Sequence, residues 1–130
     1  GVDSAQCLAR ILSHRKADIA HLQLQENFLK DEGIMALAQS IGESQLIHLS
    51  LEQNGITAKG MSKLLTSLVG NQSLVYSSWE TGDTMQEHIG AATMPALVKY
   101  LQQDNCMCQF LDLKGSNLRD PGLKILAKGL

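Results

Sequence analysis

The sequence predicts an α/β fold in which short strand–helix units stack in one direction, and two observations support this. The first is a pattern of apolar, Asn and Gly positions that occurs twice with a shift of 27 residues. The second is a change of spacing within each copy, from alternating apolar residues to apolar residues four apart. Alternation is typical of a strand, and the longer spacing of a helix. A fixed period of roughly 20–30 residues indicates stacked repeats, each burying its apolar face against its neighbours.

The two copies match position by position. The second copy reads Leu46-x-x-Leu49-x-Leu51-x-x-Asn54-x-Ile56-x-x-x-Gly60-x-x-x-Leu64-x-x-x-Leu68. The first copy reads Ile19-x-x-Leu22-x-Leu24-x-x-Asn27-x-Leu29-x-x-x-Gly33-x-x-x-Leu37-x-x-x-Ile41. Such a coincidence of residue types at identical spacing is rare by chance, so we interpret the copies as structural repeats.

Each repeat predicts a strand, a turn, a helix and a second turn. In the second copy, the strand carries Leu46, Leu49 and Leu51, and Asn54 follows where the chain leaves the sheet. An Asn side chain there can bond backbone groups that have lost their partners in the sheet. The helix covers 61–68, and Gly70-Asn71 is a typical C-terminal stop.

The phrase LxxLxLxxNxIxxxGxxxLxxxL resembles the ribonuclease-inhibitor subtype of leucine-rich repeat, whose units have about 28 residues. The resemblance covers residues 19–68 and 108–130, with a degraded copy between them. It implies a curved slab of about four repeats, with parallel strands on the concave face and helices on the convex face.

The third and fourth copies depart from this pattern. In the fourth, which begins at Cys108, Ser116 occupies the Asn position and can make a weaker form of the same backbone bond. In the third, Ser77 and Trp79 replace the two strand leucines, and Gly82 replaces the Asn. We expect Trp79 to fill the core volume that Ser77 leaves.

The third repeat also carries an insertion. The step from Ser77 to Leu111 is 34 residues, against 27 from Leu22 to Leu49 and 28 from Leu49 to Ser77. About six extra residues are therefore expected to bulge out within 82–95, because steps of the same repeat should match. Pro95 suits the first turn of a helix over 96–102.

We predict one domain, 1–130, that is a fragment of a longer array. Residues 1–18 form the helical half of a preceding repeat, in which Leu8, Ile11 and Leu12 give the apolar stripe. The repeats then cover 19–45, 46–73, 74–107 and 108–130. Because solenoid ends need capping units, uncapped ends would allow self-association.

Composition excludes several classes of function. A formal net charge of −2 offers no broad attraction for nucleic acid. No apolar run reaches the roughly 18–20 residues of a membrane span. The three cysteines, Cys7, Cys106 and Cys108, follow no disulfide framework, which favours a reducing, cytoplasmic setting.

Outward-facing strand positions are predicted to align in columns on the concave face, about 4.8 Å from strand to strand. The first column contains His21, His48, Tyr76 and Phe110. The second contains Gln23, Ser50, Ser78 and Asp112, and the third Gln25, Glu52, Glu80 and Lys114. Rings beside a mildly acidic strip are typical of a protein contact, in which carboxylates orient a basic group. The alternative is that these are solvated strand positions.

Catalytic and metal chemistry are not supported. His21 and His48 have no third strong donor in their column, and zinc needs three or four ligands. Cys106 and Cys108 have no partner pair, so Cys108 and Cys7 are interpreted as small buried apolar residues. The sequence contains no nucleophile elbow and no nucleotide-binding glycine motif. We therefore expect no enzyme activity and no cofactor.

The predicted function is protein–protein recognition or scaffolding through the concave face, with the insertion as a possible side clamp. Proteins with similar repeats include ribonuclease inhibitors, the Ran GTPase-activating protein, tropomodulins and NOD-like receptors. The resemblance therefore leaves two alternatives open. The chain could regulate a partner enzyme, as a GTPase activator or an inhibitor, or it could be a structural spacer or self-association repeat.

Overall fold

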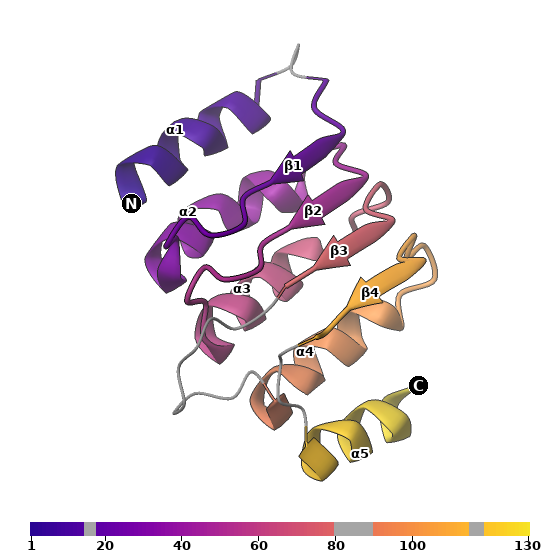
Figure 1. Cartoon of the computed structure of the whole chain (residues 1–130). Coiled ribbons are helices and arrows are strands. Elements are labelled where there is room, and N and C mark those ends of the chain that lie inside the picture. Colours follow the sequence, from indigo (N-terminus) through magenta and orange to yellow (C-terminus); the bar gives the residue numbers. More distant parts are fainter. Residues whose placement is uncertain (15–17, 80–89, 115–118) are drawn as a thin grey trace.

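The computed structural model describes residues 1–14, 18–79, 90–114 and 119–130. Helices and strands alternate along these residues: α1 (Val2–Leu12), β1 (His21–Gln23), α2 (Lys30–Gly42), β2 (His48–Ser50), α3 (Ala58–Leu68), β3 (Tyr76–Ser78), α4 (Gly90–Leu101), β4 (Phe110–Asp112) and α5 (Arg119–Gly129). The strands lie side by side in one layer, and the helices form a second layer (Figure 1). In the described part of the chain, no helix is long and apolar enough to cross a membrane.

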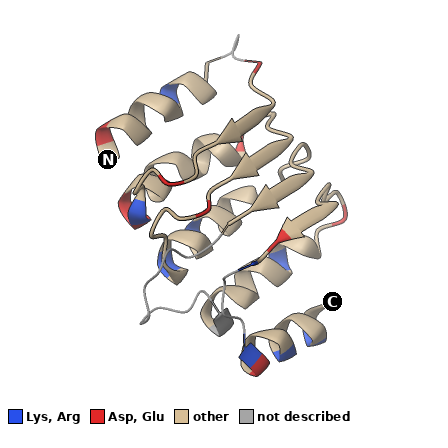
Figure 2. Cartoon of the chain, viewed as in Figure 1, with Lys and Arg blue, Asp and Glu red and all other residues tan. Residues whose placement is uncertain are grey.

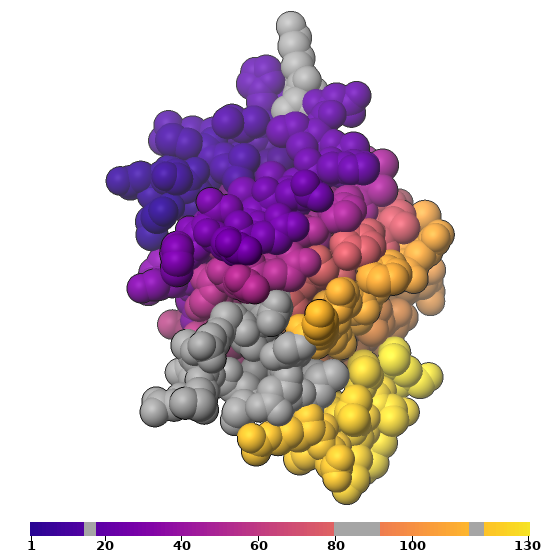
Figure 3. All heavy atoms as spheres, viewed as in Figure 1, coloured from indigo at the N-terminus to yellow at the C-terminus, as the bar shows by residue number. Residues whose placement is uncertain are grey.

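The four strands form one parallel sheet in the order β1-β2-β3-β4. The Cα register pairs His21 with His48, His48 with Tyr76, and Tyr76 with Phe110. The predicted first column is therefore confirmed, and the longer third repeat does not shift it. The space-filling view shows the successive segments as bands that run in order from the N-terminal to the C-terminal end (Figure 3).

The apolar core lies between the sheet and the helices. Its buried members come from both layers of the first three repeats, as Leu49 and Leu64 do in the second, whereas Leu111, Leu113 and Leu126 of the fourth repeat are half-buried. Gly60 is needed for close packing, since a Cβ there would lie 2.7 Å from Ile34 Cγ2 of the preceding helix. The predicted stripe at Gly60, Leu64 and Leu68 is buried along its whole length.

Asn54 bonds backbone groups after the strand, as the sequence predicts, and it also links the first two repeats, which was not predicted. Its Oδ1 accepts hydrogen bonds from the backbone N–H groups of Asn27, at 3.1 Å, and Leu29, at 3.2 Å. Its Nδ2 donates to the carbonyl groups of Leu24, Leu51 and Glu52. The side chain is fully buried, so it supplies partners to backbone groups that water cannot reach.

The third repeat preserves the inward direction of both altered strand positions. Ser77 is fully buried, and Trp79 is 2% exposed. Trp79 belongs to the same core cluster as Leu49 and Leu51, the strand leucines of the second repeat. The expected exchange of a small for a large side chain therefore agrees with the burial of both residues.

Two predictions about the helices are wrong. Helix α4 begins at Gly90, so Pro95 lies in its interior rather than in the first turn of a helix over 96–102. Pro lacks the N–H for one bond to the residue four back, and near a helix start this loss is confined to one turn. The expected bulge over 82–95 is thus helical from Gly90 onward, and its earlier part lies outside the described residues.

The second correction concerns α1, where Ile11 of the expected apolar stripe is 52% exposed. Among the described elements, α1 packs only against α2. One neighbour buries one side of a helix, and here this side includes Leu12 but not Ile11.

Candidate functional site

The most organised surface feature is a stack of four rings across the sheet, here called the aromatic column: His21, His48, Tyr76 and Phe110. The ring centroids of His21 and His48 are 5.6 Å apart, those of His48 and Tyr76 4.1 Å, and those of Tyr76 and Phe110 4.7 Å. The planes of neighbouring rings differ by 15–29°. Each strand places its ring at the same register position, so the spacing of the sheet sets the stacking distance.

The column remains accessible. His21 and Phe110 at its two ends are exposed, and His48 and Tyr76 between them are half-buried. Because neighbouring rings cover the faces of the inner two, a partner meets mainly the edges of those two rings. At the ends, one face of His21 and one face of Phe110 lack a neighbour within the column. Rings held in this way offer contact area with little loss of side-chain freedom on binding.

The second column was predicted to be part of the contact surface, but two of its four residues are buried. Gln23 is exposed and Asp112 is half-buried, but Ser50 is only 2% and Ser78 only 1% exposed. The prediction that these two serines form a contact surface is therefore wrong, because larger neighbouring side chains cover them. Ser50 Oγ lies 2.8 Å from His48 Nε2, and Ser78 Oγ donates a hydrogen bond to Glu52 Oε1. The two hydroxyls orient other side chains of the site.

The third column lies beyond the strands, in the segments that follow them. Gln25 and Lys114 are exposed, Glu52 is half-buried, and Glu80 lies outside the described residues. The second carboxylate oxygen of Glu52, Oε2, is buried and makes no hydrogen bond to the described part of the protein. Acidic residues occur on β4 and on the segments after β1 and β2 (Figure 2). This part of the sheet face is therefore mildly negative.

The arrangement does not favour metal binding. Among the described residues, no group of three His, Cys, Asp or Glu side chains could hold a metal ion. His21 and His48 stack face to face, so their nitrogens do not converge on one point as ligands must. His48 Nε2 is also engaged with Ser50.

The cysteines fall into two environments. Cys106 and Cys108 are half-buried and pack against the core, in partial agreement with the prediction for Cys108. Burial raises the pKa of the Cys108 thiol, and the nearby Cys106 raises it further. Burial also raises the pKa of the adjacent Tyr100 hydroxyl. The prediction that Cys7 is buried is wrong, because Cys7 is exposed on α1, a helix that packs only against α2 among the described elements.

Cys7 is expected to react with iodoacetamide at pH 8 at least about tenfold faster than Cys108. The thiolate is the reactive form, and both burial and a raised pKa lower its availability at Cys108. Mass spectrometry of the native protein over time measures the order of modification. Equal rates in the native protein would contradict this assignment, and equal rates in urea provide the control.

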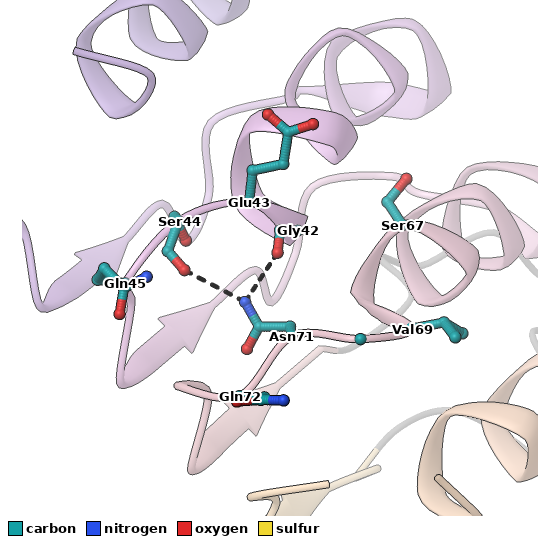
Figure 4. Close-up of a pocket in the computed structure, with 9 residues that line it drawn as sticks. Gly42, Glu43, Ser44, Gln45, Ser67, Val69, Asn71 and Gln72 are labelled. Carbon is teal, nitrogen blue, oxygen red and sulfur yellow. Dashed lines mark hydrogen bonds between the residues drawn. The ribbon is translucent and has the colours of Figure 1, made fainter. Parts of the chain in front are cut away.

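A hollow of about 550 Å³, which the sequence does not predict, lies where α2 and α3 end. Asn71 closes one side, and its amide donates to the carbonyl groups of Gly42, at 2.9 Å, and Ser44, at 3.3 Å (Figure 4). The lining is polar, open and without paired titratable groups, so it offers no catalytic chemistry. The signal for it is the helix stop Gly70-Asn71, whose asparagine joins neighbouring repeats rather than only ending a helix.

Two segments of the chain, residues 19–38 and 45–65, match the family model described as Leucine Rich repeat. These segments are the two copies that carry the regular pattern. The match, together with the alternation of helices and parallel strands, supports a leucine-rich repeat protein with an α/β solenoid fold of about four repeats. A search of curated proteins finds no match to this chain.

Proposed function

We propose that this chain is a non-catalytic recognition module that binds a protein partner through the exposed face of its sheet. The aromatic column is the observation that carries the proposal. It places four rings in one line, and leucine-rich repeat domains generally mediate protein–protein interaction. Aromatic side chains are the residues most enriched among those that dominate binding energy.

The charge beside the column supports a partner with a basic group. Glu52 and Asp112 lie on or directly after strands that carry rings of the column. The Glu52 carboxylate would attract a lysine or arginine of the partner through its charge, and the buried Oε2 could accept a hydrogen bond from that group once the side chain rotates outward. A half-buried carboxylate of this kind orients a ligand more strongly than a fully hydrated one.

A partner enzyme that is regulated by contact would meet the same face, and regulation is therefore a finer form of this proposal. All three cysteines are free thiols, which supports a reducing, cytoplasmic setting for the interaction.

Replacing Tyr76 and Phe110 with alanine is expected to weaken partner binding by at least about 30-fold, because truncating a central aromatic residue typically costs about 2 kcal/mol or more. The partner is first identified by affinity capture from lysate, and its affinity is then measured by calorimetry. Glu52→Lys, tested separately, should also lower the affinity for a partner that contacts this site with a basic group.

The matched control is Met35→Ala/Leu123→Ala, which removes two exposed apolar side chains from the helices. It should leave the affinity within about twofold, since surface substitutions outside an interface have small effects. Circular dichroism checks that every variant is folded. Unchanged affinity of the folded Tyr76→Ala/Phe110→Ala variant would contradict the proposal.

A further inference from the structure

Phe28 projects from the turn between β1 and α2 and is 78% exposed. Its ring is not part of the core cluster of the described residues, although Leu29, the next residue, is. The turn therefore directs one apolar side chain into the core and the adjacent one into solvent. The ring lies after the end of β1 and does not belong to the aromatic column.

The backbone of Phe28 is left-handed, with φ at +50°. The second repeat has a similar turn, because Glu26 and Gln53 have φ values of +58° and +55°. The turns differ two residues after Phe28, where Lys30 has φ at +53° and the equivalent Thr57 has φ at −90°. At the position equivalent to Phe28, the second repeat has Gly55, with φ at +66°. The repeat thus requires a left-handed residue here, and glycine takes that conformation without strain.

A phenylalanine at this position is unfavourable for the fold in two respects. Left-handed backbone is rare and strained for a bulky residue, and the exposed ring gains little from burial. Strained residues persist where the surrounding structure holds them, and they occur preferentially at functional sites. Burial in the fold does not account for the ring, since it is 78% exposed.

The turn holds Phe28 rigidly. The residues on either side of it, Asn27 and Leu29, both donate backbone hydrogen bonds to Asn54 Oδ1. Lys30 N–H donates to the Asn54 carbonyl at 2.9 Å, and Glu26 N–H to the Glu52 carbonyl at 3.1 Å. Since the backbone is ordered before binding, little conformational entropy remains to be lost when the ring is captured.

We propose that Phe28 is an anchor that inserts into an apolar pocket on a folded protein partner. A side chain that projects from a rigid turn requires a concave, apolar counterpart. The flanking exposed side chains, Glu26 and Lys30, have opposite charges and would pair with groups of both signs at the rim of such a pocket. An anionic membrane surface would instead require several basic residues around the ring.

The first test measures thermal unfolding of Phe28→Gly. Removing the strain and the exposed ring should raise the unfolding midpoint by about 3–5 °C. Gly55→Ala, at the equivalent position of the second repeat, should lower the midpoint, since it introduces a left-handed residue with a Cβ. A lower midpoint for Phe28→Gly would mean that the ring stabilises the fold, and it would overturn the proposal.

The second test places a photo-crosslinking phenylalanine analogue at position 28 of the full chain in cell lysate, with position 123 on α5 as the control. We expect a discrete adduct with one other protein from position 28 alone. Excess unlabelled wild-type chain should suppress this adduct, whereas Phe28→Gly should need at least about tenfold more protein to do so. Suppression by the better-folded variant at the same concentration as wild type would overturn the proposal.

Other occupants of the surface give different results. An adduct with a second copy of this chain, no adduct, or Phe28-dependent sedimentation with phosphatidylcholine–phosphatidylserine vesicles would each overturn the proposal. The Tyr76→Ala/Phe110→Ala variant serves as a further competitor. If it suppresses the adduct like wild type, Phe28 acts independently of the aromatic column, and failure of either proposal can be recognised without the other.

Discussion

Replacing Asn54 with alanine is expected to lower the free energy of unfolding by about 3 kcal/mol or more, because it leaves several buried backbone groups without partners. The side chain is fully buried and makes five hydrogen bonds, two accepted and three donated, to backbone groups of both repeats. Urea unfolding, followed by fluorescence of the single tryptophan, Trp79, measures the change.

Asn27 provides the matched control, since it occupies the same position in the first repeat. Its side chain is exposed and donates one hydrogen bond, to the Gln25 carbonyl at 2.8 Å. Asn27→Ala should therefore cost less than about 1 kcal/mol. Similar losses for the two variants would show that residue type, rather than burial between repeats, determines the contribution.

Trp79→Ala is expected to cost about 3–5 kcal/mol, the range for truncating a large aromatic side chain in a packed core. Trp79 is 2% exposed and lies where the other repeats have a strand leucine. Far-UV circular dichroism during urea unfolding measures the loss, because this variant has no tryptophan signal.

A double replacement tests whether Ser77 and Trp79 share one core volume. Trp79→Leu alone should leave a cavity, and adding Ser77→Leu should recover at least about 1 kcal/mol by filling part of it. If the second replacement destabilised the protein further, the space left by the indole would not be accessible from position 77, and the volume-exchange interpretation would be wrong.

Much of the fold is predictable from the sequence, because the repeated pattern encodes the same local structure several times. The spacing from Leu22 to Leu49 places His21 opposite His48, and it therefore predicts the aromatic column as well as the strands. The burial of Ser50 and Ser78 is not predictable in this way. It depends on which neighbouring side chains, such as His48 and Glu52, fold over the hydroxyls.

The start of α4 and the exposure of Phe28 were not predicted, for different reasons. Proline favours a first turn on average, but the segment preceding Pro95 continues the helix back to Gly90. The exposure of Phe28 does not follow from the repeat, because the shared spacing specifies only the positions at which the two copies match. Its signal is present in the two aligned copies, where a large apolar residue stands against Gly55.

In the described structure, each helix lies against the helices of adjacent repeats only, and each strand pairs with the strands of adjacent repeats only. No single interface therefore spans the whole array. If the molecule were pulled from its two ends, its interfaces between repeats could break one after another. Each repeat would unfold when its contacts with the adjacent repeat broke, and the chain would lengthen in small increments under moderate force. Such a protein would extend elastically, and a partner bound to two distant repeats would fix the distance between them.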